Sequence, residues 1–572
     1  MVSQQMTPYG MIREILQKRV SLQPFQPILG QVTMSVFSLS NGCFWPLRAP
    51  WHVLGTSFLL TAAALGASGK EGQVSYHQDI RPIFQAKCHG CHQPAKAEGD
   101  YVMTRFEQLI AGGETGDQAI LPGNAAQSYL VELITPVNGR AEMPKKDDPL
   151  STLEVDLVRR WIDQGATDDT PVNAVEKIDA ENPPVYTRPP LITSLDYSAD
   201  GAWLAVSGFH EVLLHRSDGS GLQRRLIGLS QRIESVRFSP DSSKLAMAGG
   251  LPGRMGELQI WDVASGELDL SIPVSYDTLY GVSWSPDGQL VAVGCTDNTL
   301  RAFRVEDGQQ VLFQGSHNDW VIDTIFGTEG KYLVSVGRDQ TAKLTEVATE
   351  RFVDNITSIT PGALRGGIQS VTRHPLRNEI LIGAADGTPQ IYRMVRQTKR
   401  VIGDNANLVR RFAPMTGRVF GVDYSPDGKR ITAASSLDGK GYVNVYASDI
   451  DSALSEDLKK IMQKVASSRN QEERKKVEAF WTQGTELIAS ASFDTALYAV
   501  AFQPNGQQVA VGGADGVIRV LDAQSAALTR AFVPVPLEDT DSDALYTLSV
   551  SPSSLDFGHA YQSAQLLSLI HI

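Results

Sequence analysis

The chain has 572 residues, which is enough for several domains. Its 42% hydrophobic and 20% charged content is typical of folded protein rather than of a disordered chain. The formal net charge of −13 argues against nucleic acid as a partner, because phosphates would repel an acidic protein. We interpret the acidic balance mainly as a solvated surface that aids solubility.

The first 72 residues are expected to be a targeting region. An apolar run of 15 residues covers positions 53–67, with Arg48 before it and small residues after it. The run is too short for a comfortable membrane span and is typical of a secretory signal. Because signal peptides begin near the initiator, Met34 is the expected start, and Cys43 would be absent from the mature protein. We therefore expect a periplasmic or otherwise exported protein, with an uncleaved membrane anchor as the alternative.

Residues 88–92 form the most informative motif in the chain. Cys88-His89-Gly90-Cys91-His92 is a C-x-x-C-H sequence, the attachment signature of covalently bound haem c. Its two thiols are spaced to add to the haem vinyl groups, and His92 follows directly to supply an axial nitrogen to the iron.

Two other interpretations of the motif fit the sequence less well. A structural zinc site needs four ligands, whereas the other cysteines, Cys43 and Cys295, are isolated. A thioredoxin-like dithiol would begin a helix that follows a strand. Here an amphipathic helix precedes the motif, with apolar residues at positions 76, 80, 83 and 84.

A second iron ligand must come from elsewhere in the chain. Met143, held on a loop by Pro144, offers a thioether, which is a suitable soft ligand for haem iron. The other interpretation of Met143 is a gap-filling core residue, and Met103, His77 and His89 are the competing ligands. A helix capped by Thr152 and ended by Gly165 is predicted after this loop. Its apolar residues are Val155, Leu157, Val158, Trp161 and Ile162.

These features occur along the chain in an order that is typical of one family. The segment from 74 to about 168 resembles the planctomycete-type cytochrome c domain. Besides the haem motif and Met143-Pro144, the matching stretches are Ala111-Gly112-Gly113, Leu121-Pro122-Gly123-Asn124, Ser128-Tyr129-Leu130 and Trp161-Ile162-Asp163-Gln164-Gly165-Ala166. The resemblance implies a small all-α cytochrome fold over residues 73–170 with haem c. It names no redox partner.

After a linker at 171–189, the chain repeats itself from 190 to 535. A turn such as Ser239-Pro240-Asp241 recurs every 41 to 51 residues, with a longer step of 78 residues before the last turn. Proline, Asp or Asn, and glycine suit the successive positions of a tight reversal. The period resembles WD-type β-propeller repeats, and seven anchors predict an all-β, seven-bladed propeller.

The long step predicts an insertion at 452–483. Ser455 and Asn470 each begin a helical segment, and Glu473 stands three residues after Asn470. We expect a helical hairpin in the outer loop of the sixth repeat, packed on its own fold, with partner docking as the less favoured role.

The C-terminal end differs from the repeats. Residues 540–566 resemble the severed start of an immunoglobulin-like domain. Residues 567–572 resemble a translated sequencing adaptor, and we exclude them from the fold. Catalytic domains of a longer protein would lie downstream.

No nucleophile–base motif, Walker motif or dinucleotide fingerprint is present in the sequence. The repeat histidines His210, His215, His317 and His374 have unrelated spacing and are expected to be ordinary repeat residues, and Cys295 a buried thiol.

Three functional hypotheses remain. The first is an electron-transfer cytochrome with a redox partner protein. The second is an oxidoreductase that passes substrate electrons to the haem. The third is a scaffold that binds a protein or polysaccharide through the propeller.

Overall fold

The computed structural model describes residues 72–94, 96–145, 148–171, 178–358, 364–399, 401 and 404–538 of the chain. The apolar run at 53–67, Cys43, Met34 and the C-terminal segments at 540–566 and 567–572 lie outside these residues. Among the described residues, no helix has the length and apolar character needed to cross a membrane.

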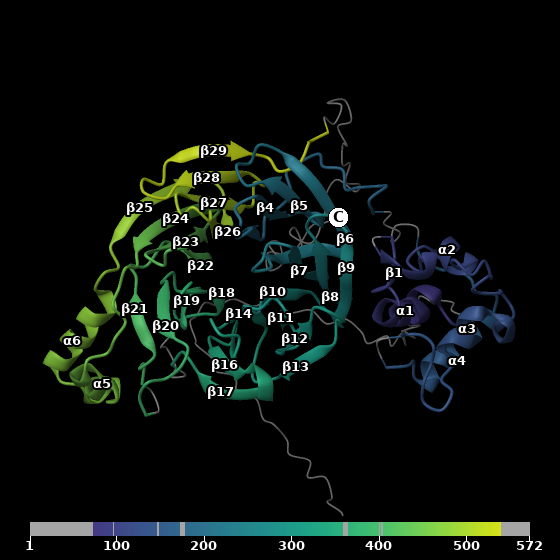
Figure 1. Cartoon of the computed structure of the whole chain (residues 1–572), viewed down its shortest axis with the longest axis horizontal. Coiled ribbons are helices and arrows are strands. Elements are labelled where there is room, and N and C mark those ends of the chain that lie inside the picture. The colour runs from purple at the N-terminus through teal and green to yellow at the C-terminus, as the bar shows by residue number, and fades with distance from the viewer. Residues whose placement is uncertain are drawn as a thin grey trace, which may run out of the picture. The chain divides into compact units, whose positions relative to one another are not determined.

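The N-terminal part of the described chain is small and helical (Figure 1). A π-helical turn at Tyr76–Ile80 leads into the first α-helix, and a short two-stranded sheet begins at His92, the last residue of the haem motif. The α-helices are α1 (Arg81–Lys87), α2 (Phe106–Ala111), α3 (Tyr129–Ile134) and α4 (Thr152–Asp163), and the strands are β1 (His92–Gln93) and β2 (Lys96–Ala97).

Helix α4 begins at Thr152, one residue earlier than predicted. Ser151, rather than Thr152, is the N-cap, because its hydroxyl accepts the amide of Glu154 while the Glu154 carboxylate accepts the amide of Ser151. This reciprocal pair is a capping box, which satisfies two amides that the first helical turn leaves without partners. At the other end, Gly165 takes a φ of +104°, which ends the helix as expected.

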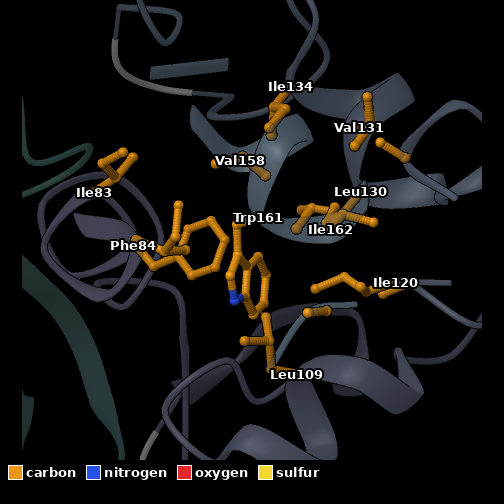
Figure 2. Packing of buried hydrophobic residues seen from close by; sticks show 14 of the residues in the cluster. Ile83, Phe84, Leu109, Ile120, Leu130, Val131, Ile134, Val158, Trp161 and Ile162 are labelled. Atoms are coloured by element: carbon orange, nitrogen blue, oxygen red, sulfur yellow. The ribbon is translucent and has the colours of Figure 1, made fainter. Parts of the chain in front are cut away.

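Trp161 lies at the centre of the helical core (Figure 2). Its ring stacks on Tyr76 at 5.3 Å and meets Phe84 and Phe106 edge-on at 6.5 and 6.2 Å. Its indole Nε1 donates a hydrogen bond to the carbonyl of Thr167. Helix α4 is thereby packed against the helix that precedes the haem motif.

The rest of the described chain is mostly β-structure. It forms five four-stranded antiparallel sheets and one seven-stranded sheet, in which every strand pairs with its neighbour along the chain. The seven-stranded sheet contains β3 (Leu195–Tyr197), β4 (Trp203–Ser207), β5 (Phe209–Arg216), β6 (Leu222–Phe238), β7 (Lys244–Leu251), β8 (Met255–Asp262) and β9 (Leu268–Ser275).

The four-stranded sheets follow in chain order. They are β10 (Leu279–Trp284), β11 (Leu290–Cys295), β12 (Leu300–Arg304), β13 (Gln310–Gln314); β14 (Val321–Phe326), β15 (Tyr332–Gly337), β16 (Ala342–Glu346), β17 (Arg351–Asn355); β18 (Ile368–Arg373), β19 (Glu379–Ala384), β20 (Gln390–Arg393), β21 (Leu408–Arg411); β22 (Arg418–Tyr424), β23 (Arg430–Leu437), β24 (Lys440–Ala447), β25 (Leu487–Phe493); and β26 (Leu497–Phe502), β27 (Gln508–Gly513), β28 (Ile518–Asp522), β29 (Leu528–Phe532).

The seven-stranded sheet consists of two four-stranded groups that share one strand. The first part of β6, up to Arg232, pairs with β5, and the part from Arg232 to Phe238 pairs with β7. Strand β6 is therefore the last strand of one group and the first strand of the next. The 17-residue length of β6 allows this double role.

The first strands of successive groups contact one another, and the first strand of the last group also contacts the first strand of the first group. The series β3, β6, β10, β14, β18, β22 and β26 ends with contacts between β26 and β3. The amide of Ile192 also donates to the carbonyl of Gly513, and the amide of Glu538 donates to the carbonyl of Tyr186. These contacts join the first group of strands to the last.

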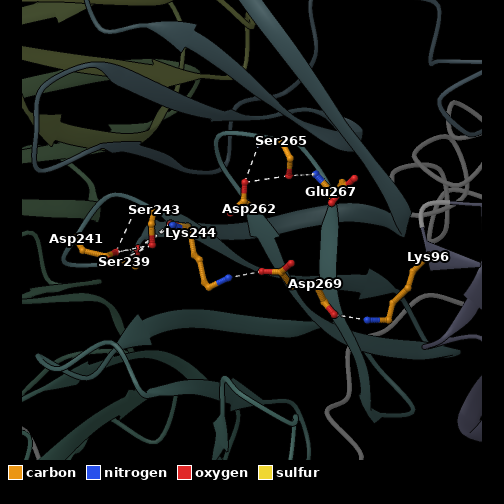
Figure 3. A network of polar contacts seen from close by, with 9 residues as sticks. All are labelled: Lys96, Ser239, Asp241, Ser243, Lys244, Asp262, Ser265, Glu267 and Asp269. Carbon is orange, nitrogen blue, oxygen red and sulfur yellow. Dashed lines mark hydrogen bonds and ion pairs between the residues drawn. The ribbon is translucent and has the colours of Figure 1, made fainter. Parts of the chain in front are cut away.

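The recurring turn is held by its own side chains (Figure 3). The Ser239 hydroxyl donates to Asp241 at 2.6 Å and accepts the amide of Lys244, and the Asp241 carboxylate accepts the amide of Ser243. The same Ser-to-Asp bond recurs at Ser198, Ser285 and Ser425. The glycines that follow three of these turns, Gly201, Gly288 and Gly428, take the positive φ that the sequence predicts.

The predicted helical insertion corresponds to α5 (Glu456–Met462) and α6 (Gln471–Thr482), which begin after the caps Ser455 and Asn470. Helix α6 contacts β21 of the preceding sheet. Phe480 lies beneath the guanidinium of Arg410 at 4.5 Å, and Glu478 pairs with Arg411. The insertion is thus packed on its own fold.

Carboxylates on the first strands reach across to other first strands. Asp196 accepts the amide of Phe238, Asp323 that of Val371, and Asp423 that of Phe502, at 2.7 to 2.9 Å. Burial raises the pKa of Asp323 to about 6 and that of Asp423 to about 7.

Asp323 gives a test of this arrangement. Its raised pKa means that the folded chain binds more protons than the unfolded chain between pH 4 and 6, so its contribution to stability is lost as the pH rises. Between pH 5 and 7, the free energy of unfolding of the wild type should fall relative to that of Asp323→Asn by on the order of 1 kcal/mol. Urea unfolding at each pH measures the difference. A difference that does not change with pH would contradict the raised pKa.

Candidate functional site

The haem motif forms a tight loop at the end of helix α1. The amide of Cys88 still donates to Phe84, as in a helix, and the amides of Cys91 and His92 both donate to the Cys88 carbonyl. This turn brings both half-buried thiols and the imidazole of His92 into one short segment.

The ring of His92 is oriented by a hydrogen bond that the sequence does not reveal. Its Nδ1 lies 3.2 Å from the carbonyl oxygen of Tyr101, which can only accept. Nδ1 is therefore the protonated nitrogen, and Nε2 keeps its lone pair. Partial burial also lowers the pKa of His92 and favours the neutral ring. A neutral imidazole fixed through its second nitrogen is the form in which histidine binds a metal.

The environment of the cysteines disfavours the dithiol interpretation. Burial, with a smaller effect from the neighbouring Cys91, raises the pKa of Cys88 to about 12. Reactive redox dithiols instead have a lowered pKa, often at a helix N-terminus. Cys88 stands at the C-terminal end of α1.

Met143 packs against the same hydrophobic cluster as Cys88. Its amide donates to the carbonyl of Leu133 at 3.0 Å, which ties the methionine loop to the end of helix α3. The side chain is half-buried. The structure thus places the thioether and the haem motif against one core, and the role of Met143 as an iron ligand stays a prediction.

The competing ligands occupy different surroundings. Met103 is buried in the helical core, and its amide donates to the carbonyl of His92. His89 is 4% exposed, burial lowers its pKa to about 3, and its Nε2 has no hydrogen-bond partner among the described residues. His89 and His92 belong to one turn, so they are poorly placed to bind opposite faces of a planar ring. His77 is half-buried near Asp169, which accepts its amide.

No group of three or more His, Cys, Asp or Glu side chains suited to a metal ion is found in the described part of the chain. Haem ligation by one histidine and one methionine requires no such group.

A second candidate site contains one of the repeat histidines, His317, and no sequence motif marks it. His317 Nε2 lies 2.8 Å from the Ser335 hydroxyl, and its Nδ1 lies 3.0 Å from Asp339. Although this is the order of a serine-hydrolase triad, Ser335 is only 1% exposed. A substrate cannot reach it. Burial would raise the pKa of Asp339, but hydrogen bonds from His317, Asn318 and Thr341 lower it to about 2.

The other residues of the repeats that the sequence analysis considered are also buried, namely His210, His215, His374 and Cys295. His215 donates through Nε2 to the carbonyl of Pro534 at 3.0 Å, and His374 packs edge-on against Tyr424. Cys295 is a buried thiol, as expected, and burial raises its pKa to about 12.

The first strands of all the groups surround a cavity of about 290 Å³. Its lining combines polar and aromatic side chains, including Glu234, Arg237, Tyr280, Gln369, Phe420 and Tyr498. Phe420 and Tyr498 meet edge-on at 5.2 Å, and Tyr280 stacks on Trp320 at 6.0 Å. The cavity offers aromatic faces and hydrogen-bonding groups to a ligand.

Comparison with known proteins confirms the two resemblances. Residues 88–147 match the planctomycete cytochrome C family. Residues 271–304 and 485–522 match the WD domain, G-beta repeat. The cytochrome match includes the haem motif and Met143.

Relatives of the repeat region carry WD-repeat names. A WD repeat-containing protein 26 homolog of Arabidopsis thaliana is 25% identical over 212 residues, which are 36% of this chain and 35% of that protein. A WD repeat and SOCS box-containing protein 1 of Danio rerio is 36% identical over 107 residues, 18% of this chain and 25% of that protein. The chain thus spans about a third or less of the length of these relatives.

The buried triad gives a prediction that separates structure from catalysis. Replacing His317 with alanine leaves the buried Asp339 without its main partner and should destabilise the chain by about 3 kcal/mol. Urea unfolding measures this loss. A fluorophosphonate probe should not label Ser335 in the folded wild type. Labelling of Ser335 at the rate of an active serine hydrolase would show that the site is catalytic.

Proposed function

We propose that this chain is an exported c-type cytochrome. In this proposal haem c is attached through Cys88 and Cys91, and the iron is bound by His92 and Met143. The observation that carries the proposal is the hydrogen bond from His92 Nδ1 to the Tyr101 carbonyl, which leaves Nε2 available at the attachment motif. The family match over residues 88–147 supports it.

The residues of the site fit this group. The thiols of Cys88 and Cys91 stand in one turn, and the neutral ring of His92 beside them is fixed by Tyr101. The helical core, centred on Trp161, supplies an apolar wall against which both Cys88 and Met143 pack. When bound, haem c supplies one-electron redox chemistry. Two protein ligands to the iron suit electron transfer to a redox partner protein and leave no position for oxygen chemistry.

For the repeat region we propose a seven-bladed β-propeller over residues 190–535. Three observations support it: the contacts that return from β26 to β3, the double role of β6, and the seven recurring turns. The cavity at the first strands would then be the central channel.

The proposed role of the propeller is an interaction platform. Relatives with WD-repeat names and a cavity with aromatic and polar lining support binding of a protein or polysaccharide. The second candidate function is an oxidoreductase that binds its substrate in the cavity and passes the substrate's electrons to the haem. The polar and aromatic lining of the cavity suits this role as well.

We also propose that the protein is exported, because bacteria attach haem c outside the cytoplasm. It would be anchored to the membrane only if the N-terminal segment is uncleaved.

The ligand assignment is tested by removing one sulfur at a time. Met143→Leu keeps the apolar packing but removes the thioether, so haem should stay covalently attached while the thioether-to-iron absorption band is lost and the reduction potential falls. Met103→Leu is the matched control and should leave both unchanged. The protein is matured with a cytochrome c assembly system and examined by absorption spectroscopy and potentiometry.

The opposite pattern would contradict the assignment. If Met143→Leu kept the band and Met103→Leu lost it, Met103 would be the ligand. If neither variant changed the spectrum, a histidine such as His77 or His89 would replace methionine as the sixth ligand.

A further inference from the structure

Three arginines gather around the face of the β18–β21 sheet that packs against the β22–β25 sheet. Arg393 on β20 stands opposite Glu379 on β19, and Arg410 on β21 stands opposite Ile391. Since Ile391 and Arg393 are two positions apart, Arg393, Arg410 and Glu379 share one face. Ile391 on this face belongs to the same hydrophobic cluster as Tyr424 and Tyr446 of the neighbouring sheet. Arg377, in the turn before β19, pairs with Glu379.

The three guanidinium groups differ in their hydrogen bonds. Arg410 donates to the carbonyls of Gln483, Val409 and Asp451 at 2.8 to 2.9 Å. Arg377 donates through Nε to Glu379 at 2.9 Å, but its Nη2 has no hydrogen-bond partner in the part of the chain that the structure describes. Arg393 is 4% exposed, and neither Nη1 nor Nη2 has a hydrogen-bond partner among the described residues.

The charges of this group do not balance. Three guanidinium groups face the single buried carboxylate of Glu379, which is 4% exposed. The carboxylate of Asp451 also acts on Arg393 and Arg410, but Asp451 is exposed, where water screens its charge. The nearby His374 is neutral, because burial lowers its pKa to about 4. A buried guanidinium with unused donors costs free energy unless it finds an acceptor. Among the described residues, the buried guanidinium groups at this point therefore outnumber the buried carboxylates.

Two hydroxyl groups complete the surroundings. Tyr424 on β22 and Ser448, directly after β24, are buried. The Ser448 hydroxyl lies close enough to Tyr424 to act as its hydrogen-bonding neighbour, although neither has a partner of normal geometry among the described residues. If one hydroxyl donates to the other, the pair keeps one free donor beside Arg393 and Arg377.

We propose that this arginine cluster binds a small inorganic anion. Arg393 would donate through both of its terminal nitrogens, Arg377 through Nη2, and Tyr424 through its hydroxyl, with Ser448 donating to the Tyr424 oxygen. Guanidinium groups and hydroxyls are donors that suit halides and oxyanions such as sulfate and phosphate. The side chain of Arg377 is about a third exposed and provides the contact with solvent. The site is separate from the haem motif and does not depend on the proposed electron transfer.

The test is the thermal stability of the full chain in different salts at constant ionic strength. Sodium gluconate is replaced stepwise by chloride, sulfate or phosphate. At least one of these anions should raise the unfolding temperature to a plateau, because a ligand that binds only the folded state stabilises it. Arg393→Met should lose this rise.

Arg469→Met is the matched control. Arg469 is also buried, at 5% exposure, but it donates hydrogen bonds to the carbonyls of Ile461, Met462 and Lys464. None of its buried nitrogens is among the atoms without a partner in the described part of the chain. This variant should keep the anion-dependent rise even if its overall stability falls.

A second measurement decides the question if Arg393→Met does not fold. Crystals of the wild type grown with bromide or with sulfate should show anomalous or oxyanion density within hydrogen-bonding distance of Arg393. A wild type with no saturable response to any of the anions, an equal response in Arg393→Met, or water alone beside Arg393 in these crystals would overturn the proposal.

Discussion

Each group of strands in this chain has apolar side chains on both faces, and this constraint determines how the repeat region is arranged. A sheet that is apolar on both faces must be covered on both sides. The hydrophobic clusters accordingly combine residues of neighbouring groups. One cluster contains Leu204 and Leu213 of the first group together with Ala510 and Ile518 of the last. The array can satisfy the constraint at its two ends only by joining them, as the contacts between β26 and β3 do.

The polar residues follow from the same arrangement. The closely packed first strands carry Asp196, Asp323 and Asp423, which bind backbone amides of other first strands and hold these strands in register. His317 and Asp339 link a connecting segment to its sheet in a similar way. Arg393 differs because neither of its terminal nitrogens has an acceptor among the described residues.

Local features of the fold could be predicted from the sequence. The turn residues, the glycines with positive φ and the caps of α5 and α6 depend on neighbours a few positions away. The cap of α4 differs from the prediction by one residue, because Ser151 and Thr152 are chemically equivalent caps and only the backbone distinguishes them. The haem motif and the resemblance to the cytochrome family could also be recognised in the sequence, because both depend on short local patterns.

Long-range features could not be predicted. The carbonyl of Tyr101 that orients His92 is a backbone group, and no side chain marks it in the sequence. Ser335, His317 and Asp339 come together through the pairing of strands, and so do Arg393, Arg410 and Glu379. The sharing of β6 between two groups depends on the same pairing and has no sequence signal beyond strand length.

The central claim is that the loop at 88–92 holds haem covalently, and mass spectrometry tests it most directly. The chain is produced with a cytochrome c assembly system, digested, and the peptide that contains Cys88 and Cys91 is weighed. We expect this peptide to carry one haem through two thioether bonds, and His92→Ala to lower the yield of this product sharply. Recovery of the peptide from the wild-type protein with both thiols unmodified, under conditions in which a known c-type cytochrome matures, would contradict the claim.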